Sequence, residues 1–257
     1  MKIVFITFGT KEYYASMGKL VDSIKSFGLF DEVNAFTEED ISTEFLKSNG
    51  DIFVEDTGFG LWLWKPYIIK DTLDKLNSGD LLLYSDAGCE YIHSPIELIR
   101  LLQKEDILSF EISHLQRDWT KKEVFKEVAA ETAEEISLAK MRHGAFIGVR
   151  KTDFSVNFVT EWLNLCCKKS LLDNKLREKQ IPTFNFHRND QSLYSILCVQ
   201  HRITAYRDPS QFGNSVRADY PNSTYPQLIN HTRSGNLSLV QRFRKSVLPK
   251  ITKLLRQ

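Results

Sequence analysis

The chain has 257 residues, of which 42% are hydrophobic, 12% aromatic and 26% charged. This composition is typical of a folded globular protein and excludes disordered and fibrous classes. Lys and Arg number 34 against 33 Asp and Glu, and the net charge of +1 argues against a globally basic nucleic-acid binder. The length predicts one large domain, residues 1–237, with an added segment, residues 238–257.

The cysteines and the apolar runs indicate the compartment. Cys89, Cys166, Cys167 and Cys198 form no CxxC pair, and we expect buried, reduced thiols. The apolar run of residues 3–8 is as short as a strand and lacks the length of a secretory signal. The sequence contains no stretch of about 18 apolar residues, so it predicts no membrane span. We therefore expect a cytoplasmic protein.

The first half of the chain alternates strands and helices. Runs rich in β-branched and aromatic residues predict strands, and apolar residues three and four apart predict helices. The expected strands are 2–8, 32–36 and 81–84, and the expected helices are 14–27, 38–46 and 67–76. This order predicts parallel strands joined by helical crossovers.

The second half continues the alternation less regularly. We expect helices at 95–104, 121–141, 154–170 and 191–200, strands at 106–110 and 145–149, and an ordered loop at 208–235. The predicted fold class is α/β, with a mostly parallel central sheet flanked by helices.

The C-terminal residues 239–257 have a different character, with six basic residues, no acidic residue and interleaved apolar positions. The pattern predicts a basic amphipathic helix, kinked near Pro249. Such a helix suits an anionic membrane surface. The alternative is a helix that packs its apolar side on the domain and leaves its charges in solvent.

Asp86 stands at the end of an apolar run, Leu83-Tyr84-Ser85-Asp86-Ala87-Gly88-Cys89. Ligands of open α/β sheets bind beyond the carboxyl ends of strands, and Asp86 falls at such an end. The small side chains at Ala87 and Gly88 let a ligand approach the backbone. A carboxylate here could hold a divalent ion or a ribose hydroxyl, or it could cap a turn.

A second candidate site is the segment Gly58-Phe59-Gly60-Leu61-Trp62-Leu63-Trp64-Lys65-Pro66. Its aromatic residues offer stacking surfaces, and Lys65 offers a cation near the start of a helix, where an anion binds well. An extended segment places Trp62 and Trp64 on the same side, and the alternative is that they are core residues. No GxGxxG or GxxxxGK[ST] motif occurs, which argues against an ordinary dinucleotide or P-loop site.

A third candidate is the polar run His187-Arg188-Asn189-Asp190-Gln191-Ser192, which opens a helix. Asp190 either caps that helix or, with Gln191, contacts sugar hydroxyls at a reaction centre. Further along, His231 and Arg233 offer a metal ligand and a cation, although a loop histidine usually ligates nothing.

In their order, the first strand with Phe8 and Gly9, GFGLWLWKP, LLLYSDAGCEY, FIGVRKT and HRNDQS resemble bacterial GT-A-type glycosyltransferases of surface-polysaccharide synthesis. The resemblance covers residues 2–201 and, more weakly, the region of His231. More distantly, the layout is similar to glycogenin and lipopolysaccharide galactosyltransferases. It implies a GT-A-like fold and transfer of a hexose from a nucleoside-diphosphate sugar, with retention of configuration left open.

The resemblance also implies roles for single residues. It implies that the loop after the first strand binds the nucleotide and that a basic residue before the central strand contacts the donor. A DxD motif would bind the metal and the ribose. An Asp-Gln pair lies by the anomeric carbon, and a late histidine completes the metal site. These roles fall on Phe8 and Gly9, Lys65, Asp86, Asp190 with Gln191, and His231. We add Trp64, Ala87, Gly88, Arg188 and Arg233 as nucleotide-sugar contacts.

One position departs from the pattern, because Gly88 stands where DxD has its second Asp. The expected cofactor is Mn²⁺ or Mg²⁺, held by Asp86, His231, diphosphate and water, with Glu90 as a substitute ligand. The alternative is metal-free stabilisation of the leaving group by Lys65 and Arg233.

The sequence therefore predicts a glycosyltransferase that uses a nucleotide sugar, in the first place a UDP-sugar, and a glycan or lipid-linked acceptor. We expect no nucleic-acid partner, and a cytoplasmic enzyme that contacts the inner face of the cytoplasmic membrane through residues 239–257. The alternatives are a Rossmann-like methyltransferase, for which Phe8-Gly9-Thr10-Lys11 is a poor glycine loop, and a non-catalytic sugar-binding protein with a degenerate site.

Overall fold

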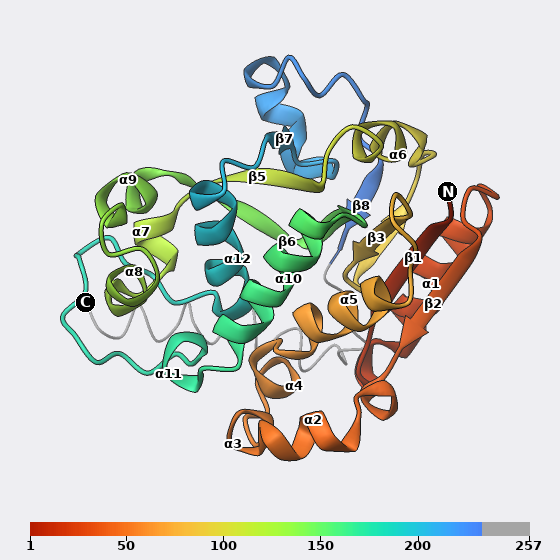
Figure 1. The fold of residues 1–257 in the computed structure, drawn as a ribbon. Coiled ribbons are helices and arrows are strands. Elements are labelled where there is room, and N and C mark those ends of the chain that lie inside the picture. Colours follow the sequence, from red (N-terminus) through yellow and green to blue (C-terminus); the bar gives the residue numbers. More distant parts are fainter. Residues whose placement is uncertain (233–257) are drawn as a thin grey trace, which may run out of the picture.

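A computed structural model of the chain describes residues 1–232 (Figure 1). Within these residues the central sheet has six strands in the order β2-β1-β3-β6-β5-β7. They are β1 (Ile3–Phe8), β2 (Glu32–Phe36), β3 (Leu81–Ser85), β5 (Ile107–Leu115), β6 (Lys140–Arg150) and β7 (Ala205–Arg207). All of them run in one direction except β6, which is antiparallel to both β3 and β5. The predicted α/β fold with a mostly parallel sheet is confirmed.

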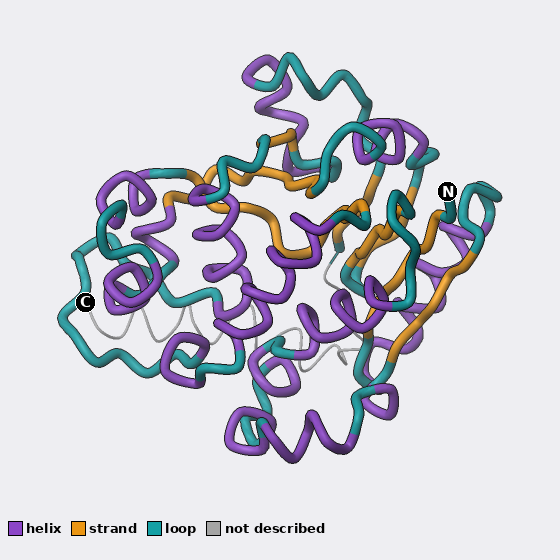
Figure 2. The backbone as a smooth tube through the Cα atoms, in the orientation of Figure 1, coloured by secondary structure: helices purple, strands orange, loops and turns teal. Residues whose placement is uncertain are grey.

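Helices cover both faces of this sheet, as Figures 1 and 2 show in the same orientation. Strand β1 shows why: Val4 and Ile6 face one apolar core while Phe5 faces the other, and all three are fully buried. The first core is closed by α5 (Trp64–Asp74), α10 (Asp153–Cys166) and α12 (Asn189–Gln200), and the second by α1 (Tyr14–Lys25) and α6 (Ile96–Leu102).

Shorter elements fill the connections. Two strands, β4 (Cys89–Tyr91) and β8 (Ile229–His231), pair antiparallel beside β3. The short helices are η1 (Lys11–Tyr13), η2 (Glu38–Asp40), α2 (Thr43–Ser48), α3 (Gly50–Phe53), α4 (Gly58–Leu61), α7 (Gln116–Trp119), α8 (Lys122–Val128), α9 (Ala133–Leu138), α11 (Lys169–Leu172) and η3 (Gln211–Asp219).

The expected single helix over residues 121–141 is wrong. The chain forms α8 and α9 there, and β6 already begins at Lys140. The reason is tertiary, because β5 extends to Leu115 and its ladder takes up Lys140 and Arg142. Likewise the region 208–235, expected as a loop, contributes η3 and β8, and β7 just before it was not expected. In both regions the strands form by pairing with distant parts of the chain, and local propensity does not show such pairing.

The tryptophan-rich segment is not extended but forms a tight left-handed turn. Residues 58–62 all have positive φ, from 49° at Phe59 to 72° at Gly60. A Cβ on Gly60 would come within 2.5 Å of the Phe53 ring, and one on Gly58 within 2.4 Å of the Trp62 ring. The glycines are therefore required by both backbone and packing. The turn leads directly into α5, whose first turn holds Lys65 and Pro66 as predicted.

The helices of residues 1–232 include none that combines the length and the apolar character needed to cross a membrane. The proposed basic helix at 239–257 lies outside the described residues, as does the whole of the added segment 238–257.

Candidate active site

The candidate active site lies at the carboxyl edge of β3. Asp86 follows directly after Ser85, the last residue of the strand, and its backbone N–H donates to the carbonyl of Ala145 in β6 (3.0 Å). Tyr84 donates its hydroxyl to the Asp86 carboxylate. The Asp86 side chain remains 33% exposed. The strand end thus presents a fixed carboxylate that a ligand can reach.

Lys65 bridges Asp86 to a second carboxylate. Its Nζ lies 3.3 Å from Asp86 Oδ1 and 3.4 Å from Asp190 Oδ2, and it donates to the carbonyl of Gly144 (3.0 Å). The Lys65 side chain is only 4% exposed. One of its three donors is therefore bonded to a carbonyl, and the two carboxylates lie at ion-pair distance. One buried cation therefore holds two carboxylates together.

Asp190 lies in the first turn of α12 and does not cap the helix, since the residue at the N-cap is Arg188. The turn begins with Asn189 in the left-handed region (φ 43°). The indole of Trp162 in α10 donates to the Asp190 carbonyl (3.0 Å). The reading of Asp190 as a helix cap is therefore wrong, and its carboxylate faces Lys65.

Gln191 continues the same edge. Its amide donates to the carbonyl of Arg142 (2.8 Å), and its side chain lies across Gly144. A Cβ on Gly144 would approach the Gln191 side chain to 3.2 Å, so the glycine leaves room for this contact. Gly144 thereby contacts both Lys65, through its carbonyl, and the Gln191 side chain.

The shared cation affects the two carboxylates differently. Burial raises the pKa of Asp190 to about 6 even though Lys65 lowers it. Burial also raises the pKa of Asp86, but Lys65, the Tyr84 hydroxyl and the nearby His231 outweigh it and lower the pKa below its usual value. Burial lowers the pKa of Lys65, but Asp190 and Asp86 together raise it above its usual value. Near neutral pH the cluster holds one positive and two negative charges.

Two histidines lie near Asp86, and one of them is paired with a third carboxylate. The rings of His231 in β8 and His143 in β6 have centroids 5.3 Å apart. Nε2 of His143 is 3.6 Å from Asp208 Oδ2, and its Nδ1 accepts the backbone N–H of Ala145 (2.9 Å). Both histidines and Asp208 are almost fully buried.

The residues expected to bind a metal can be tested against this geometry. Among residues 1–232, no three or more His, Cys, Asp or Glu side chains are placed to hold a metal ion together. Asp86 and His231 are neighbours, and divalent ions such as Mg²⁺ are commonly held by one or two protein ligands plus substrate phosphates. The donor set fits a metal shared with a diphosphate, not one held by the protein alone.

The aromatic residues expected near the nucleotide are mainly core. Phe8 and Trp64 stack on each other with centroids 3.9 Å apart, and they are 3% and 6% exposed. The Trp64 indole donates to the carbonyl of Gly58 (2.9 Å). This stack forms the wall behind Lys65, whose Nζ is 5.7 Å from the Trp64 ring.

The small residues bring two loops together. A Cβ on Gly9 would lie 3.4 Å from that of Ala87, so the loops after β1 and β3 are in contact. The carbonyl of Gly88 accepts hydrogen bonds from the backbone and hydroxyl of Thr232 (3.1 and 3.2 Å), which places the chain next to His231 against this loop. Arg233 lies outside the described residues.

Arg188 lies at the rim of the site. Its guanidinium stacks over the Trp119 ring at 4.2 Å, and Nη1 is 3.5 Å from Gln191 Oε1. Of the twelve predicted site residues, the structure therefore gathers eleven around one strand end or beside it.

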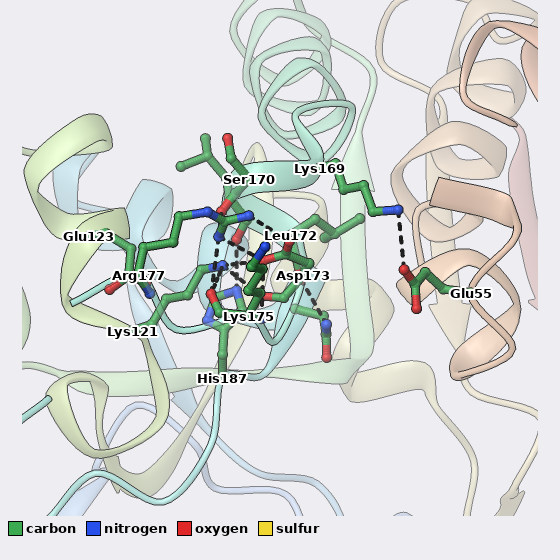
Figure 3. A network of polar contacts seen from close by, with 12 residues as sticks. Glu55, Lys121, Glu123, Lys169, Ser170, Leu172, Asp173, Lys175, Arg177 and His187 are labelled. Carbon is green, nitrogen blue, oxygen red and sulfur yellow. Dashed lines mark hydrogen bonds and ion pairs between the residues drawn. The ribbon is translucent and has the colours of Figure 1, made fainter. Parts of the chain in front are cut away.

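A separate polar network holds the residues at the start of α12 in place (Figure 3). Lys121, fully buried, donates to Asp173 Oδ1 (2.6 Å) and to the Asp173 carbonyl (2.7 Å), and Arg177 pairs with the other carboxylate oxygen (2.7 Å). His187 Nε2 donates to the carbonyl of Leu171 (2.8 Å) and Asn189 to that of Leu172 (2.7 Å). We call Lys121, Asp173, Arg177 and His187 the anchor network.

Sequence reasoning missed Tyr84, Gly144, His143 and Asp208. Tyr84 was visible as the residue two before Asp86, on the same side of a strand. His143 and Gly144 precede the expected strand 145–149, and their place at the site follows from the antiparallel direction of β6, which no local pattern reports. Asp208 lay in a region expected to be a loop.

No protein-family profile matches the chain, and no curated protein is detectably similar in sequence. Among solved structures it aligns with mouse xyloside xylosyltransferase 1 (TM-score 0.49, 9% identity, 91% of this chain and 98% of that one). It aligns with the galactosyltransferase LgtC in complex with donor and acceptor sugar analogues (TM-score 0.47, 13%, 95% and 94%). A third is a glycosyltransferase that takes part in glycosylation of the major capsid of PBCV-1 (TM-score 0.49, 12%, 95% and 100%). All three are glycosyltransferases by name.

Proposed function

We propose that the protein is a glycosyltransferase that moves a hexose from a nucleoside-diphosphate sugar, in the first place a UDP-sugar, to a hydroxyl of a glycan or lipid-linked acceptor. We assign it to cell-surface polysaccharide synthesis. The observation that carries the proposal is the Asp86–Lys65–Asp190 cluster at the carboxyl edge of β3.

The charges of the cluster suit this reaction. In sugar transfer the anomeric carbon–oxygen bond to the diphosphate breaks, and positive charge develops on the sugar ring. A buried cluster with two carboxylates and one ammonium favours such a charge, and preorganised groups of this kind contribute several kcal/mol. Asp190 and Gln191 are then the residues beside the anomeric carbon.

The acceptor hydroxyl attacks that carbon, and its proton passes to the departing diphosphate oxygen in a retaining route. The fixed position of Gln191 over Gly144 suits it to orient one of the two sugars. Positioning of both reactants contributes about 7 kcal/mol or more.

Lys65 acts on the carboxylates in this scheme. Since its buried ammonium lies 3.3 and 3.4 Å from the two carboxylates and donates to the Gly144 carbonyl, we assign it to holding Asp86 and Asp190 in place. This modifies the expectation from sequence that Lys65 contacts the diphosphate directly.

Asp86 and His231 would hold a Mn²⁺ or Mg²⁺ ion together with the diphosphate. When bound, the ion supplies positive charge for the leaving group. A carboxylate next to a diphosphate otherwise repels it, which is the physical reason to retain the metal in the proposal.

The test is hydrolysis and transfer from a panel of UDP-, GDP- and CMP-sugars, with Mn²⁺ or with EDTA. We expect turnover of a UDP-sugar, reduced by EDTA. Turnover of none of the donors contradicts the proposal, and binding of adenosylmethionine would favour the methyltransferase. That alternative is poorly supported, because Gly9 and Thr10 lead into the short helix η1 and not into a glycine-rich loop.

We also propose that residues 239–257 contact an anionic membrane surface on the cytoplasmic side. Removal of these residues is expected to weaken binding to vesicles that contain phosphatidylglycerol and to leave hydrolysis of a soluble donor unchanged. Equal vesicle binding by both chains contradicts this part of the proposal.

A further inference from the structure

The segment 173–188 between α11 and α12 contains no helix or strand and exceeds the ~12–15 residues beyond which irregular connections are usually functional or disordered. It is held in one shape by polar contacts with α7 and α8. These join Lys126 to Glu178, Gln180 to Glu123, and both Thr183 and Asn185 to Asp118, at 2.6–2.9 Å. A connection fixed at so many points presents its outward side chains in a defined place.

Its last residues build an aromatic cluster with the end of β5 and α7. The rings of His114 and Trp119 stack with centroids 4.6 Å apart, and Phe186 meets Trp119 edge-on at 4.8 Å. The Arg188 guanidinium covers Trp119 at 4.2 Å and lies 5.7 Å from the Phe186 ring. We call His114, Trp119, Phe186 and Arg188 the aromatic platform.

Phe186 is the outermost member of the platform. It is 53% exposed, although burial of an aromatic ring is favourable. Edge-on packing against Trp119 fixes its orientation, so the ring offers a face to solvent without loss of order. A rigid aromatic face with an arginine beside it is the kind of surface that binds a ring with an apolar face and polar edges.

The platform is continuous with the candidate active site. The Arg188 backbone and the Ser192 hydroxyl both bond to the Trp119 carbonyl (3.1 and 2.9 Å), which ties the platform to the first turn of α12. Contacts run from Asp86 through Lys65 to Asp190, and from Gln191 through Arg188 to Trp119. The Asp190–Gln191 pair therefore contacts Lys65 on one side of the chain of contacts and Arg188 of the platform on the other.

We propose that the aromatic platform is the acceptor subsite and binds a carbohydrate ring, with its apolar face on Phe186 and its hydroxyls toward Arg188 and Gln191. This inference rests on the proposed function, since the donor is assigned to the Asp86 side of the pair.

The experiment is saturation-transfer NMR on the full chain with UDP present and with four probes: methyl β-glucoside, methyl β-galactoside, lactose and N-acetyllactosamine. We expect transfer to ring protons of at least one probe in wild type. Phe186→Ala should reduce that signal at least fivefold, and Phe186→Leu, which keeps apolar bulk without an aromatic face, should reduce it too. The matched control is Phe154→Ala, which truncates a 38% exposed phenylalanine in α10, away from the platform.

Two outcomes overturn the inference: no wild-type transfer from any of the four sugars, or a signal that Phe186→Ala leaves unchanged. Hydrolysis of UDP-sugars by wild type and by Phe154→Ala is measured in parallel. Its absence contradicts the proposed function instead, so the two failures are distinguishable.

Discussion

Two buried lysines hold aspartates in this protein, and they do so with opposite charge balance. Lys65 lies between two carboxylates at 3.3 and 3.4 Å, so that cluster carries an excess negative charge. Lys121 and Arg177 share the one carboxylate of Asp173 at 2.6 and 2.7 Å, so the anchor network carries an excess positive charge.

The pKa values follow this balance. Burial raises the pKa of both Asp190 and Asp173, but hydrogen bonds from Arg177 and Lys121 outweigh it at Asp173 and bring its pKa to about 2, while that of Asp190 stands at about 6. Burial lowers the pKa of Lys121, whereas its two aspartates raise that of Lys65. The anchor network, with ion pairs of 2.6 and 2.7 Å, suits a structural role, and the looser, carboxylate-rich cluster suits the stabilisation of an incoming positive charge.

The largest effect that we expect is the loss of stability caused by a substitution in the anchor network. Asp173→Asn leaves Lys121 buried next to Arg177 without a carboxylate, and it should lower the free energy of unfolding by about 3–5 kcal/mol. Urea denaturation measures it. A loss below about 1 kcal/mol would contradict the structural role.

The second prediction concerns activity. Asp86→Asn should lower donor turnover at least about 100-fold, equivalent to about 2.7 kcal/mol of transition-state stabilisation, because a preorganised charge is lost. The matched control is Asp106→Asn. Asp106 is also 33% exposed and also paired with a cation, Arg150, but it lies at the amino end of β5, whereas Asp86 lies at the carboxyl end of β3. Near-wild-type turnover by the Asp86 variant refutes its assigned role.

The third prediction uses the pH dependence of the site. If Asp190 must be ionised, turnover should fall as pH drops through about 6. Lys65→Met removes a cation that lowers the pKa of Asp190, and it should move this acid limb upward by about one pH unit. Lys65→Arg keeps the charge and serves as the control. An acid limb at the same pH in all three proteins excludes Asp190 as its source.

Much of the fold could be predicted from sequence, since the local hydrophobic periodicity predicts β1, β2, β3, α1 and α5. Asp86 and Asp190 were predicted as site residues because each stands where a predicted strand ends or a helix begins, and the structure places both beside Lys65. Phe8 and Trp64 were predicted to contact the nucleotide, yet sequence could not tell a ligand-facing ring from a buried stack.

The anchor network was invisible in the sequence. Lys121 lies 52 residues before Asp173 in the chain, and His187 was singled out only as part of a polar run and not as a partner of this network. Only the packing of α8, α11 and the segment before α12 brings them together. The same holds for His143, whose place at the site depends on the antiparallel insertion of β6.

The smallest expected effect tests the anchor network by pH. Burial, helped by the charge of Lys121, lowers the pKa of His187 to about 3, so the folded protein keeps this ring neutral while the unfolded chain protonates it near pH 6.5. Its stabilising contribution is therefore present above pH 6.5 and is lost as pH falls from there toward 3.

Between pH 7 and 5.5 this loss amounts to about 1 kcal/mol in wild type. His187→Gln keeps a donor for the Leu171 carbonyl but does not titrate, so the fall should be absent from the variant and should appear in full as the difference between the two proteins. Asp190, with a raised pKa, changes stability in the opposite direction over the same interval, but it is common to both proteins and cancels. Urea midpoints at the two pH values measure the difference. Parallel pH dependence of wild type and variant would mean that the ring is already accessible to protons in the folded state, and that the anchor network is looser than the site it supports.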